Sequence, residues 1–290
     1  MQAFMNCRSL TSIEIPSSLT SIGESVFENC SNLTSITIPN GVKKIGMMAF
    51  KSCSGLQNVT MSENLISISS SAFMYCSSLK EIEIPSTLKS ISANTFNGCS
   101  SLTSIEIPSS VTSIGISAFE NCSSLTEIVI SENVTSLGRY AFKGCSSLTE
   151  VTIPQKVTSI NQSVFSGCSG LTSINIPSGV TSIGDTAFSG CSKLTEITIP
   201  EAVTSIGGSA FYNCSSLTEV TIPENVASIK SGAFSGCSGL IKVEMLSETP
   251  PATLGSNAFE NCNFVTANKK GILVPVGKVE DYKGANGWSS

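Results

Sequence analysis

The sequence predicts a solenoid, a single domain spanning residues 1–290 in which short coils stack on one another. Three observations predict it. Cysteine recurs every 23 residues from Cys7 to Cys237, and Cys262 follows with two extra residues. Phenylalanine precedes the cysteine by three residues, from Phe27 to Phe234, and leucine often follows the cysteine by three. Such a period is typical of stacked repeats, because each repeat can bury its apolar residues only against its neighbours.

One repeat, residues 102–124, shows the elements in order. Residues 102–107 read Leu-Thr-Ser-Ile-Glu-Ile, and this apolar alternation with β-branched residues predicts a short strand. Pro108 ends the strand because proline cannot donate to a sheet ladder. Residues 111–114 predict a second extended piece, and Gly115 stands where the chain must turn. The Ala-Phe-x-x-Cys segment that follows has helical spacing and predicts a turn or two of helix.

The regular repeats extend over residues 1–245, and residues 246–290 predict an irregular closing coil. Atypical end repeats are expected, because a cap must present a polar outer face. Two regular coils also depart from the pattern, since Ser62 and Ser131 replace the proline. These replacements predict local irregularity within an unchanged fold.

The unit Leu-x-x-Ile-x-Ile-Pro, Val-x-x-Ile-Gly, Ala-Phe-x-x-Cys resembles the BspA-like leucine-rich repeats of bacterial and protozoan surface proteins. The likeness covers almost the whole chain, and the stretch from Tyr282 to Trp288 resembles that family's closing coil. The resemblance implies a leucine-rich-repeat solenoid, a right-handed β/α superhelix. Its parallel β-sheet would lie on one face, with short strands and helical turns on the other. It also implies a place on the cell surface or outside the cell, and adhesion to host extracellular-matrix proteins or to other cells.

Composition excludes several classes of function. The chain is 40% hydrophobic and 13% charged, so it can bury a core. A net charge of -5 argues against nucleic-acid binding, which needs clustered Lys and Arg. No apolar run is long enough to span a bilayer, and no secretory signal is visible. Because the chain opens inside a repeat, we expect a fragment whose uncapped first coil associates end to end.

The twelve cysteines have three interpretations. Stacked thiols could form disulfides by distance, although side chains in a ladder point the same way. A metal array is a second possibility, but structural zinc sites need pairs that converge on one point. The favoured interpretation is a ladder of buried free cysteines, because free cysteine is among the most buried residue types.

The outward positions of the predicted sheet carry threonine and glutamate. Among the glutamates are Glu83, Glu106, Glu127 and Glu150, at positions that we expect to lie one coil apart. One interpretation is an acidic binding strip for a basic partner or a divalent cation. The other is that these charges keep the protein soluble and prevent sheets from pairing with other sheets.

The positions flanking each Ala-Phe pair form a rim that is mostly small or polar. In the N-terminal half they include Met48, Tyr75 and Tyr140. Exposed Met and aromatic clusters often mark contact sites, so this edge could contact a partner protein or a second copy. Scattered apolar surface residues are the ordinary alternative.

Catalysis has little support. The chain has no histidine, so the usual nucleophile–histidine pair cannot be assembled, and the sequence indicates no cofactor or metal ligand set. The sequence therefore favours a non-enzymatic surface solenoid that binds proteins through an extended, preformed face. A passive stalk that displays another domain is the alternative, and the near-identity of the coils favours it.

Overall fold

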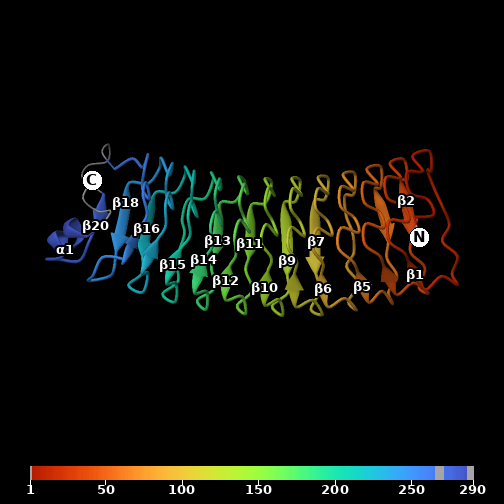
Figure 1. Ribbon diagram of the computed structural model, residues 1–290, viewed down its shortest axis with the longest axis horizontal. Coiled ribbons are helices and arrows are strands. Elements are labelled where there is room, and N and C mark those ends of the chain that lie inside the picture. The colour runs from red at the N-terminus through yellow and green to blue at the C-terminus, as the bar shows by residue number, and fades with distance from the viewer. Residues whose placement is uncertain (1, 265–270, 286–290) are drawn as a thin grey trace. The chain divides into compact units, whose positions relative to one another are not determined.

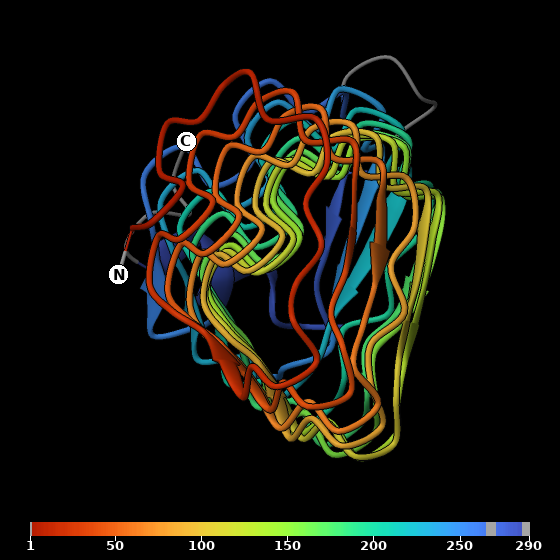
Figure 2. The ribbon, with the colours of Figure 1, turned by 90° about the vertical axis from the view of Figure 1, so that its right-hand side faces the viewer.

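A computed structural model describes residues 2–264 and 271–285. The chain falls into two compact units, Met1–Leu148 and Thr149–Ser290. Each is a stack of coils, and Figure 2 looks along the stacks, where the coils of each unit lie over one another. The predicted parallel solenoid is confirmed, while the single domain over residues 1–290 stays a prediction.

The Met1–Leu148 unit contains short parallel strands on two sides of its coils (Figure 1). The longer strands form the pairs β2–β4 and β7–β9, and the two-residue strands form the sheets β1–β3–β5 and β6–β8–β10. Every pairing joins residues 23 apart, such as Ser104 with Glu127, so the ladder repeats the sequence period. The strands are β1 (Ser21–Ile22), β2 (Ser35–Thr37), β3 (Lys44–Ile45), β4 (Asn58–Thr60), β5 (Ser67–Ile68), β6 (Ser90–Ile91), β7 (Ser104–Ile107), β8 (Ser113–Ile114), β9 (Glu127–Ile130) and β10 (Ser136–Leu137).

The Thr149–Ser290 unit repeats this arrangement. Its two-residue strands form the sheet β12–β14–β15–β17–β19, and its longer strands form β11–β13 and β16–β18–β20. The elements are β11 (Glu150–Thr152), β12 (Ser159–Ile160), β13 (Ser173–Asn175), β14 (Ser182–Ile183), β15 (Ser205–Ile206), β16 (Glu219–Ile222), β17 (Ser228–Ile229), β18 (Lys242–Met245), β19 (Thr253–Leu254), β20 (Ile272–Leu273) and α1 (Val279–Gly284).

The third side of each coil, around Ala-Phe-x-x-Cys, differs from the expectation. It is a chain of hydrogen-bonded turns, and α1 is the only α-helix among the described residues, so the β/α part of the expectation is not confirmed. The N–H groups of Met48 and Phe50 donate to the next coil, to the carbonyls of Ser70 and Ala72 at 3.2 and 2.8 Å. The N–H of Ala49, which lies between them, donates within its own coil to the Gly46 carbonyl at 3.3 Å. Alternate N–H groups therefore join the coils rather than a helix.

This side forms turns instead of a helix because the backbone is left-handed at two positions in each coil. The residues two before and two after the phenylalanine have positive φ, for example Met48 at 55° and Ser52 at 60°. An α-helix needs φ near −63° at every residue, so these positions interrupt it. Asn, Ser and Gly occupy most of them, and Gly and Asn adopt this conformation at the lowest cost. The Ala-Phe-x-x-Cys spacing indicated a helix, but the residues with positive φ form turns instead.

The phenylalanine, cysteine and leucine columns of the core each repeat one residue type, while other columns mix Ile, Val and Leu. Phe27, Phe50, Phe73 and their equivalents are buried, and adjacent rings within a unit stack with centroids 5.0–5.8 Å apart. Each buried Leu, Ile or Phe contributes about 1.5–3 kcal/mol relative to exposure. Because every coil supplies the same set, the core is continuous through each unit.

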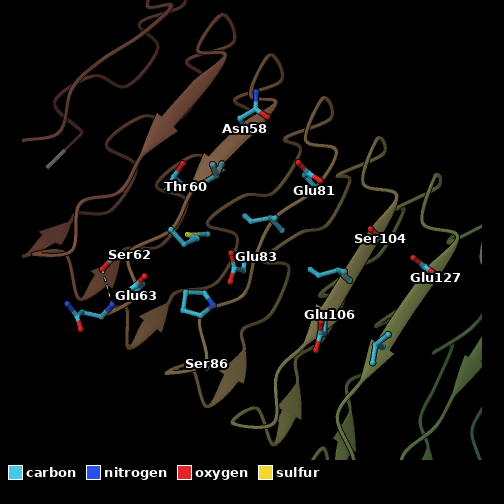
Figure 3. Close-up of a pocket in the computed structure, with 17 residues that line it drawn as sticks. Asn58, Thr60, Ser62, Glu63, Glu81, Glu83, Ser86, Ser104, Glu106 and Glu127 are labelled. Carbon is cyan, nitrogen blue, oxygen red and sulfur yellow. Dashed lines mark hydrogen bonds between the residues drawn. The ribbon is translucent and has the colours of Figure 1, made fainter.

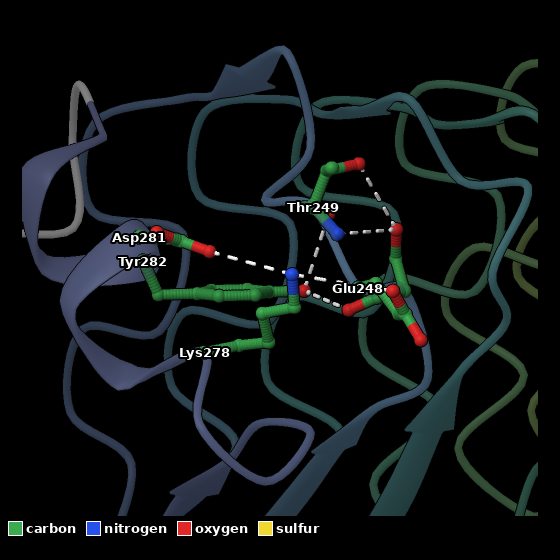
Figure 4. Close-up of polar contacts among 6 residues, drawn as sticks. Glu248, Thr249, Lys278, Asp281 and Tyr282 are labelled. Atoms are coloured by element: carbon green, nitrogen blue, oxygen red, sulfur yellow. Dashed lines mark hydrogen bonds and ion pairs between the residues drawn. The ribbon is translucent and has the colours of Figure 1, made fainter.

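The closing segment of the Thr149–Ser290 unit is held by Tyr282 of α1 (Figure 4). This side chain is buried, and its hydroxyl donates to the main-chain carbonyls of Ser247 and Thr249 at 2.9 and 3.3 Å. Lys278 adds an ion pair with Asp281 at 3.6 Å. The closing coil over residues 246–290 stays a prediction, and Trp288 lies outside the described residues.

Candidate functional site

A broad open groove of about 1200 Å³ lies on the longer-strand side of the Met1–Leu148 unit (Figure 3). We call it the acidic groove. Its lining comes from residues 58–64, 81–86 except Ile84, 104–106, and Glu127 and Val129. These residues belong to consecutive coils, so the groove runs across the strands rather than along one of them.

The groove brings together three of the four glutamates predicted on the sheet face. Glu83, Glu106 and Glu127 are exposed and line it. Glu150 belongs to β11 in the other unit, where it pairs with Ser173 of β13. The proposed strip of four therefore divides between the two units.

Two further glutamates line the groove. Glu81 was recognisable as an outward strand position, but Glu63 lies beyond the strand and was missed. One sequence feature could have indicated its place: Ser62, immediately before Glu63, replaces the proline of the other coils. The Ser62 hydroxyl accepts a hydrogen bond from the Asn64 N–H at 3.2 Å, and Ser131 does the same for Asn133. The Ser62 carbonyl also accepts from the Leu65 N–H at 3.2 Å, as the Pro85 carbonyl accepts from Leu88 at 3.0 Å, so the fold is unchanged as expected.

The groove coincides with an interruption of the sheet ladder. β4 pairs only with β2, and β7 pairs only with β9, so residues 81–84 between them are not part of a strand. Within the described chain, the N–H groups of Glu81, Ile82 and Glu83 donate no hydrogen bond. The strands on either side are therefore not held to this segment by a ladder, and the face is hollowed there.

The carboxylates of the groove are not neutralised by neighbours. Its lining contains five glutamates and no Lys or Arg. None of the five forms an ion pair with another described residue. On the turn side, by contrast, Glu28 pairs with Lys51 at 3.0 Å and Glu120 with Lys143 at 3.1 Å. Burial raises the pKa of Glu28, but hydrogen bonds from Ser25 and Lys51 outweigh it and lower that pKa overall.

The second predicted set, Met48, Tyr75 and Tyr140, lies on the turn side of the same unit and outside the acidic groove. All three have left-handed φ, at 55°, 61° and 61°. Bulky side chains rarely occupy this region, and each costs about 1–2 kcal/mol there. Tyr75 is 47% exposed, and its ring lies against the backbone of Gly98 in the next coil. The Lys143 ammonium lies 5.4 Å from the centroid of the Tyr140 ring.

The cysteine column forms the predicted buried ladder of free thiols from Cys30 to Cys237, while Cys7 is exposed. Within each unit the buried thiols donate to the carbonyl of a phenylalanine one coil earlier, as from Cys99 to Phe73 at 3.3 Å and from Cys191 to Phe165 at 3.2 Å. Burial raises the pKa of Cys99 and of Cys191 to about 12. These thiols are therefore neutral and unreactive near neutral pH.

Nowhere in residues 2–264 and 271–285 do three or more Cys, Asp or Glu side chains converge as metal ligands would. No helix in the same residues has the length and apolar character needed to cross a membrane.

Comparison with known proteins identifies a family for the repeat region rather than for the acidic groove. The family model for the BspA type leucine rich repeat region, in six copies, matches residues 1–122, 66–189 and 158–273. No curated protein matches the chain.

Solved structures show the same likeness. A leucine-rich repeat protein from Bacteroides ovatus ATCC 8483 is 31% identical, with a TM-score of 0.74, covering 85% of this chain and 69% of that one. A leucine rich cell surface protein from Faecalibacterium prausnitzii A2-165 is 29% identical, with a TM-score of 0.59, covering 94% and 81%. The pneumococcal vaccine antigen PcpA is 18% identical with a TM-score of 0.59, covering 94% and 76%, and shares the fold.

Proposed function

The chain belongs to the BspA-type leucine-rich repeat family, and we propose that it is a non-enzymatic, surface-displayed solenoid that binds proteins and mediates adhesion. The acidic groove is the observation that carries this proposal. A hollow across several coils, lined by five carboxylates without Lys or Arg, distinguishes one place on an otherwise repetitive surface. Extended preformed faces of this kind are the surfaces that repeat proteins use for binding.

One of the similar solved structures supports the proposed location. The Faecalibacterium prausnitzii relative is described as a cell surface protein, which supports display at the cell surface or secretion. Extracellular-matrix or other host-surface proteins are the partners that we propose to test first. The groove is open rather than enclosed, and the chain has no histidine to act as a base, which supports a binding role over catalysis.

The test is direct binding of the purified chain to a panel of immobilised extracellular-matrix proteins at physiological salt. Two variants locate the site: one changes Glu83, Glu106, Glu127 and Glu150 to Gln, and one combines Met48→Asp with Tyr75→Asp. Saturable binding supports adhesion. Weakening by the first variant assigns binding to the strand side, and weakening by the second assigns it to the turn side. Absence of binding to any panel member, together with failure to capture any surface protein, would refute adhesion.

The alternative function is a passive stalk, and the uniform core columns favour it. In the Thr149–Ser290 unit, stacked rings from Phe165 to Phe234 repeat at 5.0–5.6 Å with little variation between coils. A stalk predicts no saturable binding to any partner and no effect of either variant.

End-to-end self-association through the first coil is part of the proposal. Phe4, which stacks on Phe27 at 5.4 Å, is 37% exposed. Sedimentation at several concentrations tests it, since a profile independent of concentration would exclude such association.

A further inference from the structure

We infer that the acidic groove binds an extended, lysine- or arginine-rich segment of the partner protein, laid across the coils. This inference rests on the proposed function and adds the chemistry of the occupant. Charge complementarity carries it, because none of the five carboxylates of the lining pairs with a cation among residues 2–264 and 271–285, and the lining itself holds no Lys or Arg. A basic segment supplies the missing countercharge.

The arrangement of the carboxylates favours a segment over a single ion. Glu63, Glu83, Glu106 and Glu127 come from four consecutive coils. Coils stacked at a strand spacing of about 4.8 Å spread these charges over roughly 14 Å. A Ca²⁺ ion needs six to eight oxygens at about 2.3–2.6 Å, which requires ligands that converge on one point. Among the described residues, no three acidic side chains converge in this way.

The length of the groove and the residues at its floor indicate how long the bound segment is and which side chains it carries. An extended chain rises about 3.3 Å per residue, so roughly five residues span the charges, and alternate side chains face the same way. Val129 is 61% exposed and Met61 is half-buried at the groove surface. Lys and Arg lay their aliphatic stems on such apolar groups while the charged heads reach carboxylates. The expected segment therefore alternates basic and small residues.

The test measures binding of synthetic peptides to the full chain by fluorescence anisotropy. The probe is labelled Lys-Thr-Lys-Thr-Lys-Thr, and a Glu-Thr peptide of equal length is the control. The groove variant carries Glu83→Gln, Glu106→Gln and Glu127→Gln. The matched variant carries Glu196→Gln, Glu201→Gln and Glu224→Gln, three exposed glutamates in the other unit with the same change in net charge.

We expect saturable binding of the Lys-Thr peptide that weakens as salt rises from 50 to 300 mM, as screening predicts. The groove variant should lose about tenfold or more in affinity, and the matched variant less than about twofold. Equal loss in both variants would show attraction to net charge alone and overturn the inference. So would equal binding of the Glu-Thr peptide, or absence of Lys-Thr binding. Competition by 1 mM Ca²⁺ that requires the same glutamates would instead assign the groove to a cation.

The matrix-protein panel separates this inference from the proposed function. If the groove variant still binds a panel protein as the unaltered chain does, adhesion stands and the basic-segment inference fails. If the Lys-Thr peptide binds in the groove but no natural protein binds, the chemistry of the groove stands and adhesion fails.

Discussion

The buried thiol ladder sets an alkaline limit to stability, which can be tested at Cys99 and Cys191. Both side chains are fully buried, and burial raises both pKa values to about 12. An unfolded thiol ionises at about 8.5, so between that pH and about 12 the unfolded chain loses a proton that the folded chain keeps. Stability is therefore fully present below about pH 8.5 and is lost as the pH rises toward 12.

The magnitude follows from this difference. At pH 10, ionisation favours the unfolded chain by about 1.5–2 kcal/mol per thiol, or about 3–4 kcal/mol for the pair. The free energy of unfolding then falls by about 1.4 kcal/mol per pH unit for each thiol. Replacing both by alanine should remove this contribution while lowering stability at pH 7, because each substitution leaves a small cavity.

The assay is urea unfolding followed by circular dichroism at intervals from pH 7 to pH 11. The chain with Cys99→Ala and Cys191→Ala should show a shallower decline above pH 9 than the unaltered chain. Cys7→Ala serves as the matched control, because its side chain is exposed and its removal should leave the decline unchanged. An identical decline in the double variant and the unaltered chain would refute the assignment of these thiols as the titrating groups.

Three other predictions concern packing and reactivity. Phe119→Ala should lower the free energy of unfolding by about 3–5 kcal/mol in urea denaturation, because the ring is fully buried between two stacked neighbours; a loss below about 1 kcal/mol would contradict continuous packing. Gly98→Ala should lower the melting temperature because its φ is +74° and a Cβ would collide with the Tyr75 ring. In a Tyr75→Asn background, Gly98→Ala should lower the melting temperature less, because only the backbone strain remains. An unchanged drop in melting temperature would exclude the collision. In thiol titration, Cys7 should react in the folded chain while the buried column reacts only after denaturation, and rapid labelling of the column in the folded chain would disprove its burial.

The stacked fold was predictable because the 23-residue period appears directly in the positions of Cys, Phe and Leu. The turn side was not, because Ala-Phe-x-x-Cys has helical spacing while the left-handed positions lie outside that pattern. Their Ser, Asn and Gly residues were visible, but residues such as Met48 and Tyr75 occupy equivalent positions against their intrinsic preference.

The candidate site was predictable in part. Glu83, Glu106 and Glu127 were recognisable as outward strand residues, since alternation assigns the face of each. The hollow was not, because it depends on the missing ladder at residues 81–84, whose sequence Glu-Ile-Glu-Ile is an ordinary strand pattern. Glu63 joins the groove through the turn at Ser62, so its place depends on tertiary geometry.

The 23-residue register of the regular coils has a consequence for how such a chain can change in length. Because Ser182 pairs with Ser205 and Ser205 with Ser228 through equivalent contacts, one whole coil of that stack could be deleted and the flanking coils would meet the same partners. Duplication or loss of a complete 23-residue segment in the Thr149–Ser290 unit thus alters reach without altering the acidic groove, whose residues all lie in Met1–Leu148. Unequal recombination between near-identical coils supplies such changes in a single genetic step, so the number of coils in this unit and the lining of the acidic groove can change independently.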